Sequence, residues 1–367
     1  MHRREFLRAS VGAGVVAFDG AFAAARTEES IRKFLRLEVG DGKSVAGRVA
    51  VVVDEQGTSL AAFGSADAPG VAMDGHTVFE IGSITKVLTA LILTDMVSRG
   101  EVAFDDPVAK YLPASVILHE RGRSITLLDL ASYRSGLPNM PDNLPAGWDL
   151  SNPFADYTTE DLYAFLSSHV PQYEPGRHYQ YGNLGFALLG IALARSAGRS
   201  YEELLIARIC DPLGLTHTRV TCTGNMREHL AHGHTPENLK PAQRWDMPGL
   251  PEMGAVLSTA TDLAVVLKAS MGVKQTPLSA SFVRLLGTRR ATSAGGTDAA
   301  LGWFISSNKT EEIVWKSGQT GGFSSFIGFS TRSHRGAILL SNGGYTGDGF
   351  RLINPDFDPG DLGAILR

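Results

Sequence analysis

The chain has 367 residues, 43% hydrophobic and 20% charged, so it can bury a large core and does not have a disordered composition. A formal net charge of -4 excludes the basic surplus that binders of nucleic acids and anionic membranes need. We therefore expect one globular domain that handles a small or neutral substrate and binds no nucleic acid.

The first 25 residues are typical of an export signal rather than of a folded element. The pair Arg3-Arg4 precedes a short apolar run, and paired arginines indicate the twin-arginine export route. The run is interrupted by Asp19 and is too short to span a membrane. The sequence predicts a cleaved signal over residues 1–25, a single domain over 26–367, periplasmic localisation and no stable membrane span.

Two β-prone runs open the predicted domain, and more close it. Residues 47–55 and 58–64 flank Gln56-Gly57, which favours a hairpin. Helical patterns follow over 83–99, 159–168, 184–197 and 201–209. Short β-rich segments return at 301–305, 313–316, 323–330 and 337–342.

This order of elements predicts an α+β fold. Strands from both ends of the chain would form one antiparallel sheet flanked by helices. The mostly helical residues between them, roughly 84–290, would form an inserted lobe, with the functional cleft where the two parts meet. The longest irregular loop, residues 138–153, is suited to line that cleft.

Cysteine and histidine content gives no support for a metal site. The only two cysteines are Cys210 and Cys222, and His229, His232 and His234 lack the H-E-x-x-H spacing of a zinc site. We expect neither a metal nor another cofactor. The sequence leaves open whether the two cysteines form a bridge in an oxidising compartment.

The first of three candidate motifs is Ser83-Ile84-Thr85-Lys86. The helix that follows is apolar on nearly all sides, so it should be buried. Burial of the Lys86 ammonium group in its first turn is unfavourable, because the charge loses its hydration and opposes the helix dipole. Packing alone therefore gives no reason for a lysine at this position. Ser83 and Lys86 share one helical face, where a desolvated lysine can take the proton of an attacking serine. Alternatively Ser83 is only an N-cap, although a capping box would have Glu or Gln, not Lys, at position 86.

The second motif is Tyr181-Gly182-Asn183, directly before a predicted helix. Asn183 is either an ordinary N-cap or an amide that holds the acyl amide of a substrate. Tyr181 is either a core residue or a phenol that exchanges a proton with Lys86.

The third motif is Lys316-Ser317-Gly318, followed by Gln319. It ends a β-prone run, so Lys316 could be a solvated lysine at a strand end. Alternatively, an edge strand aligns an amide substrate there, with Gly318 allowing close approach. The backbone N–H groups of Ser83 and Gln319 would then form an oxyanion hole, while Lys316 and Ser317 bind a substrate carboxylate.

In this order the motifs resemble the S-x-x-K, Y-x-N and K-[ST]-G signature of serine β-lactamases and penicillin-binding proteins. The Tyr in the second motif is similar to class C β-lactamases, D-Ala-D-Ala carboxypeptidases and related esterases. Further similar stretches carry the resemblance over residues 47–342: DDPVAKYLP at 105–113, SGLP at 135–138, PLGL at 212–215, STATDL at 258–263 and GGFSSFIGF at 321–329.

The resemblance implies a β-lactamase or transpeptidase-like fold and acyl transfer. Ser83 would be the nucleophile, Lys86 and Tyr181 would move protons, and water would release the acyl group. Lys316 favours a β-lactam or a D-Ala-D-Ala-type peptidoglycan peptide, because esterase-like relatives often have His or Trp there. Two alternatives remain: an esterase or D-amino-acid peptidase with the same residues, and a slowly acylating sensor or cell-wall binding protein.

Two features depart from the family pattern. Tyr133-Arg134 precedes the SGLP turn, where relatives often have a His. Residues 343–367 offer only a short helical pattern near 361–367, whereas relatives usually finish with a longer helix on the sheet. We expect a monomer.

Overall fold

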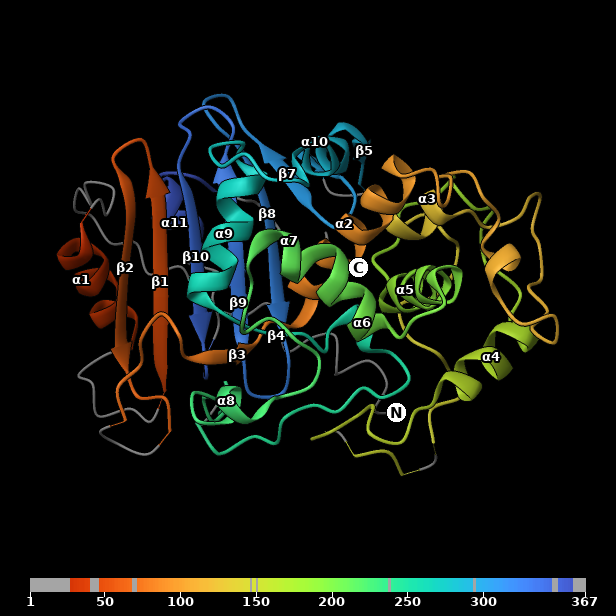
Figure 1. Ribbon diagram of the computed structural model, residues 1–367, viewed down its shortest axis with the longest axis horizontal. Helices are drawn as coiled ribbons and strands as arrows, with labels where there is room; N and C mark the ends of the chain where they lie inside the picture. Colours follow the sequence, from red (N-terminus) through yellow and green to blue (C-terminus); the bar gives the residue numbers. More distant parts are fainter. Residues whose placement is uncertain are drawn as a thin grey trace.

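An eight-stranded antiparallel sheet stands beside a group of helices (Figure 1). The computed structural model describes residues 27–39, 46–67, 71–145, 147–149, 151–236, 239–292, 295–344 and 349–358. The predicted export signal and the helical pattern near 361–367 lie outside these residues. The strand order β2-β1-β10-β9-β8-β7-β6-β5 joins strands from both ends of the chain. The predicted α+β class and the origin of the sheet are confirmed.

The strands of this sheet are short, and each pairs antiparallel with its neighbours. They are β1 (Gly47–Asp54), β2 (Gly57–Gly64), β5 (Arg290–Ala291), β6 (Thr297–Ala299), β7 (Phe304–Ser307), β8 (Glu312–Gln319), β9 (Ser324–Ser330) and β10 (Gly336–Ser341). The predicted hairpin is formed by β1 and β2. Its turn lies one residue earlier than expected, because Gly57 already pairs with Asp54.

Helices cover both faces of the sheet. In Figure 1, α9 (Ala260–Ser270) lies in front of the central strands, and α11 (Gly349–Ile353) lies behind them. Every residue of β9 and β10 is buried as a result. The amphipathic helix α1 (Glu28–Val39) packs beside the edge strand β2. Although α9 falls within the segment expected to form the helical lobe, it packs on the sheet.

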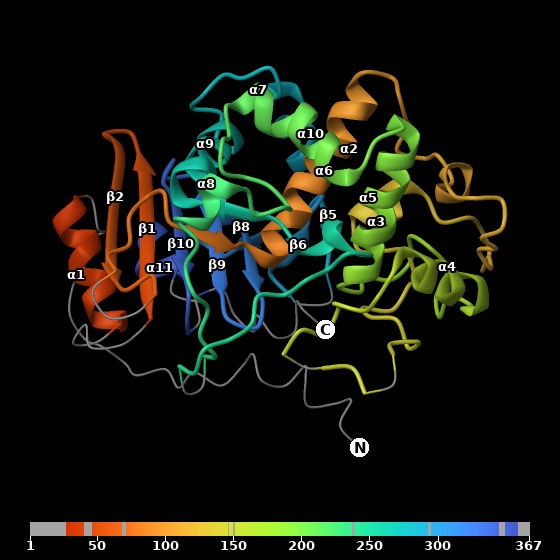
Figure 2. The ribbon, with the colours of Figure 1, turned by 60° about the horizontal axis from the view of Figure 1, so that its bottom comes forward.

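The helical lobe is built around two buried helices, α2 (Thr85–Ser98) and α5 (Asn183–Ala197), which lie side by side (Figure 2). Nearly every residue of both is buried, which explains why neither has a polar face in the sequence. The other helical elements are η1 (Gly82–Ile84), η2 (Val108–Tyr111), α3 (Leu127–Ala131), α4 (Thr159–Ser168), α6 (Tyr201–Leu205), the π-helical turn η3 (Ile206–Cys210), α7 (Asp211–Leu213), α8 (Gly224–Arg227), η4 (Pro251–Met253) and α10 (Ser279–Gly287).

A small two-stranded sheet leads the chain into the lobe. It consists of β3 (Val78–Glu80) and β4 (Leu257–Thr259), and β3 ends two residues before η1. Ser83 therefore lies only three residues after Glu80, the last residue of β3. Within the described residues, no helix is long and apolar enough to cross a membrane.

Both cysteines are free thiols, so the bridge that the sequence left open is not formed. Cys210 is buried and donates a hydrogen bond to the Thr218 carbonyl oxygen over 3.2 Å. Burial raises the pKa of its thiol to about 12, which makes Cys210 a packing residue rather than a nucleophile.

Candidate active site

Ser83 lies where a tight turn passes into the buried helix α2. The turn requires Gly82, whose φ is +48°, a left-handed conformation that glycine tolerates. The Oγ atom of Ser83 accepts two hydrogen bonds, from Lys86 Nζ at 2.8 Å and from the Tyr181 hydroxyl at 2.9 Å. The first two predicted motifs therefore converge on one hydroxyl oxygen.

Lys86 is fully buried, with 0% of its surface exposed. Its Nζ atom donates to Ser83 Oγ at 2.8 Å, to Asn183 Oδ1 at 2.8 Å and to the Met253 carbonyl oxygen at 2.6 Å. All three acceptors are uncharged, so burial lowers the pKa of Lys86 to about 7 without a compensating carboxylate. A substantial fraction of the amine is neutral near pH 7 and can accept a proton.

Tyr181 is buried and remains a phenol. Burial raises its pKa to about 12, although the hydrogen bond to Ser83 opposes the rise. Its hydroxyl donates to Ser83 Oγ and accepts from Lys316 Nζ at 3.4 Å. Tyr181 and Lys86 therefore meet at the Ser83 oxygen, which lies between the two groups that were expected to exchange a proton.

Asn183 is the first residue of α5, and Gly182 occupies the N-cap position. The N-cap interpretation of Asn183 is therefore wrong. Its amide faces the site instead: Oδ1 accepts from Lys86 Nζ, and Nδ2 donates to the Met140 sulfur over 3.5 Å. Its backbone N–H donates to Asn139 Oδ1 at 3.0 Å, so the start of the 138–153 loop touches the site.

The third motif lies inside β8 rather than beyond its end. On one side, the residues from Lys316 to Gln319 pair with β9, but on the other side β7 pairs only as far as Trp315. Among the described residues, no strand pairs with this side of β8 beyond Trp315, so the strand has a local open edge there although it is an interior strand of the sheet. Ser317 is half-buried there and Gln319 is exposed.

The backbone of β8 presses directly against the Ser83 turn. A Cβ atom on Gly318 would overlap the Ile81 carbonyl oxygen and lie 2.8 Å from Ser83 N, and one on Gly82 would lie 2.6 Å from Gln319 N. Only residues without a side chain allow this approach. The approach places the backbone of Gly318 against Ser83 and the backbone of Gly82 against Gln319.

Comparison with known proteins identifies the family. A family model described as Beta-lactamase matches residues 28–355. The protein belongs to the beta-lactamase family. It is 27% identical over 308 residues to a beta-lactamase of Escherichia coli K12, covering 74% of this chain and 76% of the relative. It is 28% identical over 318 residues to the D-alanyl-D-alanine-carboxypeptidase/endopeptidase AmpH of the same strain, covering 82% and 80%.

A solved class C beta-lactamase has the same fold, with a TM-score of 0.76 at 20% sequence identity, covering 91% of this chain and 99% of that chain. Together with the family match, this likeness makes the protein a serine hydrolase of α+β fold. The resemblance drawn from the three motifs is thereby confirmed at the level of family and fold.

Lys316 of this beta-lactamase family member is not a solvated lysine, because only 1% of its surface is exposed. Its Nζ atom donates to the Tyr133 hydroxyl at 3.0 Å and to the Tyr181 hydroxyl at 3.4 Å. The same atom lies 4.5 Å from the ring centroid of Phe304 and 4.6 Å from that of Tyr181. Burial and the nearby Lys86 charge hold the pKa of Lys316 well below its usual value.

Two contacts of the site were not found in the sequence. The Met253 carbonyl oxygen could not be predicted, because any residue type can supply a backbone acceptor. Tyr133 was noticed in the sequence, because it stands where relatives often have a His before the SGLP turn. Its contact with Lys316 could not be predicted, because 183 positions separate the two residues.

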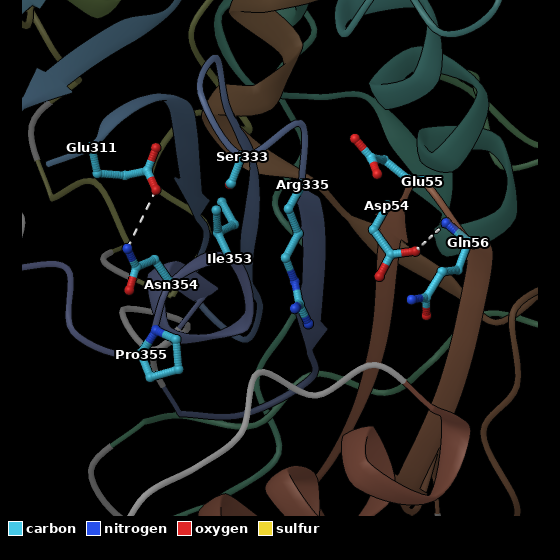
Figure 3. Close-up of a pocket in the computed structure, with 9 residues that line it drawn as sticks. All are labelled: Asp54, Glu55, Gln56, Glu311, Ser333, Arg335, Ile353, Asn354 and Pro355. Carbon is cyan, nitrogen blue, oxygen red and sulfur yellow. Dashed lines mark hydrogen bonds between the residues drawn. The ribbon is translucent and has the colours of Figure 1, made fainter.

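Two cavities of this family member lie apart from Ser83. One of about 300 Å³ lies at the turn between β1 and β2 (Figure 3) and is lined by Asp54, Glu55, Gln56, Glu311, Ser333, Arg335, Ile353, Asn354 and Pro355. The other, of about 200 Å³, lies between Gln243 and much of the 138–153 loop. None of the residues of the three motifs lines either cavity. The candidate active site is therefore assigned to the open edge of β8, where these residues meet.

Proposed function

We propose that the protein cleaves a β-lactam or a D-Ala-D-Ala-type amide through an acyl-enzyme on Ser83. The observation that carries this proposal is the pair of hydrogen bonds from Lys86 and Tyr181 to one oxygen, Ser83 Oγ. Two groups that can move protons in opposite directions at a nucleophile are what acyl transfer needs.

In the first step, Ser83 Oγ attacks the carbonyl carbon and its proton passes to neutral Lys86. The backbone N–H groups of Ser83 and Gln319 stabilise the oxyanion. When the C–N bond breaks, the leaving nitrogen takes a proton from the Tyr181 hydroxyl, and the proton on Lys86 restores the phenol. Water then adds to the ester, which releases the acid and regenerates Ser83.

The pKa values support Lys86 as the base and Tyr181 as the proton donor. A group with a pKa of about 7 is partly neutral at neutral pH, whereas a phenol with a pKa of about 12 keeps its proton. Tyr181 already donates to Ser83 Oγ, which becomes the bridging oxygen of the ester.

The open edge of β8 supports an amide substrate. Beyond Trp315, the free side of the strand can pair with an extended acyl amide, and Asn183 at the other side of the site can hold the acyl group. We assign the substrate carboxylate to Lys316 and Ser317. One relative is named a D-alanyl-D-alanine-carboxypeptidase/endopeptidase, and a D-alanyl-D-alanine end of a peptide carries a carboxylate.

The test is intact-mass analysis over time after mixing with a chromogenic cephalosporin, while the colour change is followed. S83A should give neither adduct nor colour. The matched control is S30A, because Ser30 has the same Ser-x-x-Lys spacing but lies in α1. An adduct that persists in S83A would refute the assignment.

The same experiment separates the kinds of enzyme. Rapid colour with a transient adduct indicates a β-lactamase, and a persistent adduct with little colour indicates a penicillin-binding protein or a sensor. If neither is seen, p-nitrophenyl esters and D-Ala-D-Ala peptides decide between an esterase and a peptidase.

We propose that residues 1–25 direct export by the twin-arginine route and that the mature enzyme is a periplasmic monomer. The Arg3-Arg4 pair supports the route. Replacing both arginines by lysine should retain the uncleaved chain in the cytoplasm, while the wild-type chain is recovered from the periplasm without its signal. Light scattering of the mature protein tests the monomer.

A further inference from the structure

Tyr133 has a backbone conformation that tyrosine rarely adopts. Its φ is +59°, and of the three described non-glycine residues with positive φ it alone is buried, with 3% of its surface exposed. Such a conformation is unfavourable for a bulky residue and persists only where its surroundings impose it. Tyr133 is therefore held in place by specific contacts.

The backbone contacts tie Tyr133 to the segment that carries Tyr181. The Gln180 N–H donates to the Tyr133 carbonyl oxygen at 2.9 Å, and the Gly176 N–H donates to the Arg134 carbonyl oxygen at 2.7 Å. Two backbone hydrogen bonds therefore tie the turn after α3 to the chain leading to α5, and one of them involves Gln180, the residue next to Tyr181.

The Tyr133 ring lies in an aromatic stack beneath the site. Its centroid is 5.2 Å from that of Tyr181 at an angle of 25° and 5.6 Å from that of Phe304 at 15°. Lys316 Nζ lies over the same group of rings, 5.3 Å from the centroid of Tyr133. The stack encloses the buried amine of Lys316 and limits the positions open to it.

Two branches of hydrogen bonds start from the Lys316 amine, one through the Tyr133 hydroxyl and one through the Tyr181 hydroxyl. A phenol has one proton to donate, and Tyr133 directs its own to the Gly302 carbonyl oxygen at 3.5 Å. Its oxygen is then free to accept from Lys316 Nζ at 3.0 Å. Because Lys316 also donates to the Tyr181 oxygen, the Tyr181 proton is left to point at Ser83 Oγ.

We propose that Tyr133 is a positioning residue that holds the Lys316 amine on the Tyr181 hydroxyl and so directs the Tyr181 proton to Ser83. The inference rests on the proposed function, because a directed proton matters only if the leaving group takes it. Without the Tyr133 hydroxyl, Lys316 loses its shorter hydrogen bond and is free to leave Tyr181.

The decisive variant is Y133F, which keeps the ring stack and removes only the hydroxyl. Its matched control is Y157F, because Tyr157 is also buried and its hydroxyl donates to Asn143 Oδ1 at 2.9 Å, outside the three motifs. Both variants lose one buried hydroxyl, so a purely structural role for Tyr133 would affect them alike. Their thermal midpoints should agree within about 3 °C.

The kinetic measurement compares two leaving groups. With a β-lactam, whose leaving nitrogen needs a proton, Y133F should acylate about tenfold more slowly than Y157F. With a p-nitrophenyl ester, whose leaving group needs none, the two variants should differ by less than about twofold. The titratable groups that contact Tyr133 are Lys316, through a hydrogen bond, and Tyr179 and Tyr181, through ring contacts. If Y133F and Y157F were acylated at equal rates by the β-lactam as well as by the ester, the proposal would be contradicted.

A crystal structure of Y133F gives a second test that does not depend on activity. The distance between Lys316 Nζ and the Tyr181 hydroxyl should increase beyond hydrogen-bonding range. An unchanged distance would overturn the positioning role, even if wild-type acylation at Ser83 is observed. If Ser83 is never acylated in the wild type, the proposed function fails, and the structure alone still decides whether Tyr133 positions Lys316.

Discussion

The Nζ atom of Lys86 lies 2.8 Å from the Oδ1 atom of Asn183, although 97 positions separate the two residues. The contact joins the first turns of α2 and α5, the two buried helices of the lobe. Because the amide carries no net charge, it favours the ammonium form of Lys86 less than a carboxylate would. The contact therefore positions Lys86 without cancelling the lowering of its pKa by burial.

Replacing this amide by a carboxylate should change the pH dependence of the enzyme. In N183D a negative charge beside Lys86 favours the ammonium form and raises its pKa by about one to three units. At pH 7, kcat/KM should fall at least about tenfold and recover at alkaline pH. The control is N225D in α8, where Asn225 is exposed. If kcat/KM of N183D fell at the same acidic pH as that of the wild type, the role of Asn183 would be contradicted.

The wild-type enzyme should lose activity as the pH falls through about 7. Lys86 acts in its neutral form, and its pKa is lowered to about 7, so protonation removes the base. Below this value kcat/KM should fall about tenfold per pH unit, and above about pH 8 it should level off. K86R should be inactive at every pH, because a guanidinium group keeps its proton. A profile that is flat from pH 5 to 9 would exclude Lys86 as the base.

The close approach of β8 to the Ser83 turn should not tolerate a side chain. In G318A the new methyl group would overlap the Ile81 carbonyl oxygen and push β8 away from Ser83 N. Loss of one oxyanion donor lowers kcat about 100-fold or more. The control is G224A in α8, where an added Cβ meets nothing within 4 Å. Acylation rates by stopped flow compare the two, and equal rates would contradict the oxyanion hole assigned to Gln319.

Glu252 should make the protein less stable as the pH rises. Its carboxyl group is buried, its Oε2 atom has no hydrogen-bond partner within the described part of the chain, and burial raises its pKa to about 8 from 4.5. Between these two values the folded state binds a proton that the unfolded state has lost, so the free energy of unfolding falls with pH.

Removing this titration should flatten the pH dependence of stability. Relative to pH 5, E252Q should retain about 3 kcal/mol more of its free energy of unfolding at pH 8 than the wild type does. The matched control is E228Q, because Glu228 is exposed. Urea unfolding at the two pH values measures the difference, and parallel slopes for E252Q and the wild type would show that Glu252 ionises normally.

Local pattern predicted much of the fold. The apolar run after Ser83 indicated a buried helix, and α2 is buried along nearly its whole length. The range 159–168 coincides with α4, which begins with a capping box formed by Thr158 and Asp161. Such features depend on residues within one or two turns of each other, so neighbouring residues suffice to specify them.

By itself, the sequence determined the family, the order of strands and helices, and the pairing of Ser83 with Lys86, because a separation of three residues on a helix places both on one face. Tertiary structure alone decided that Asn183 faces Lys86 rather than capping α5, that Lys316 is buried, and that Tyr133 supports it. These contacts join residues 97, 135 and 183 positions apart. They depend on how α2, α5 and β8 pack together, and no local pattern of residues specifies that packing.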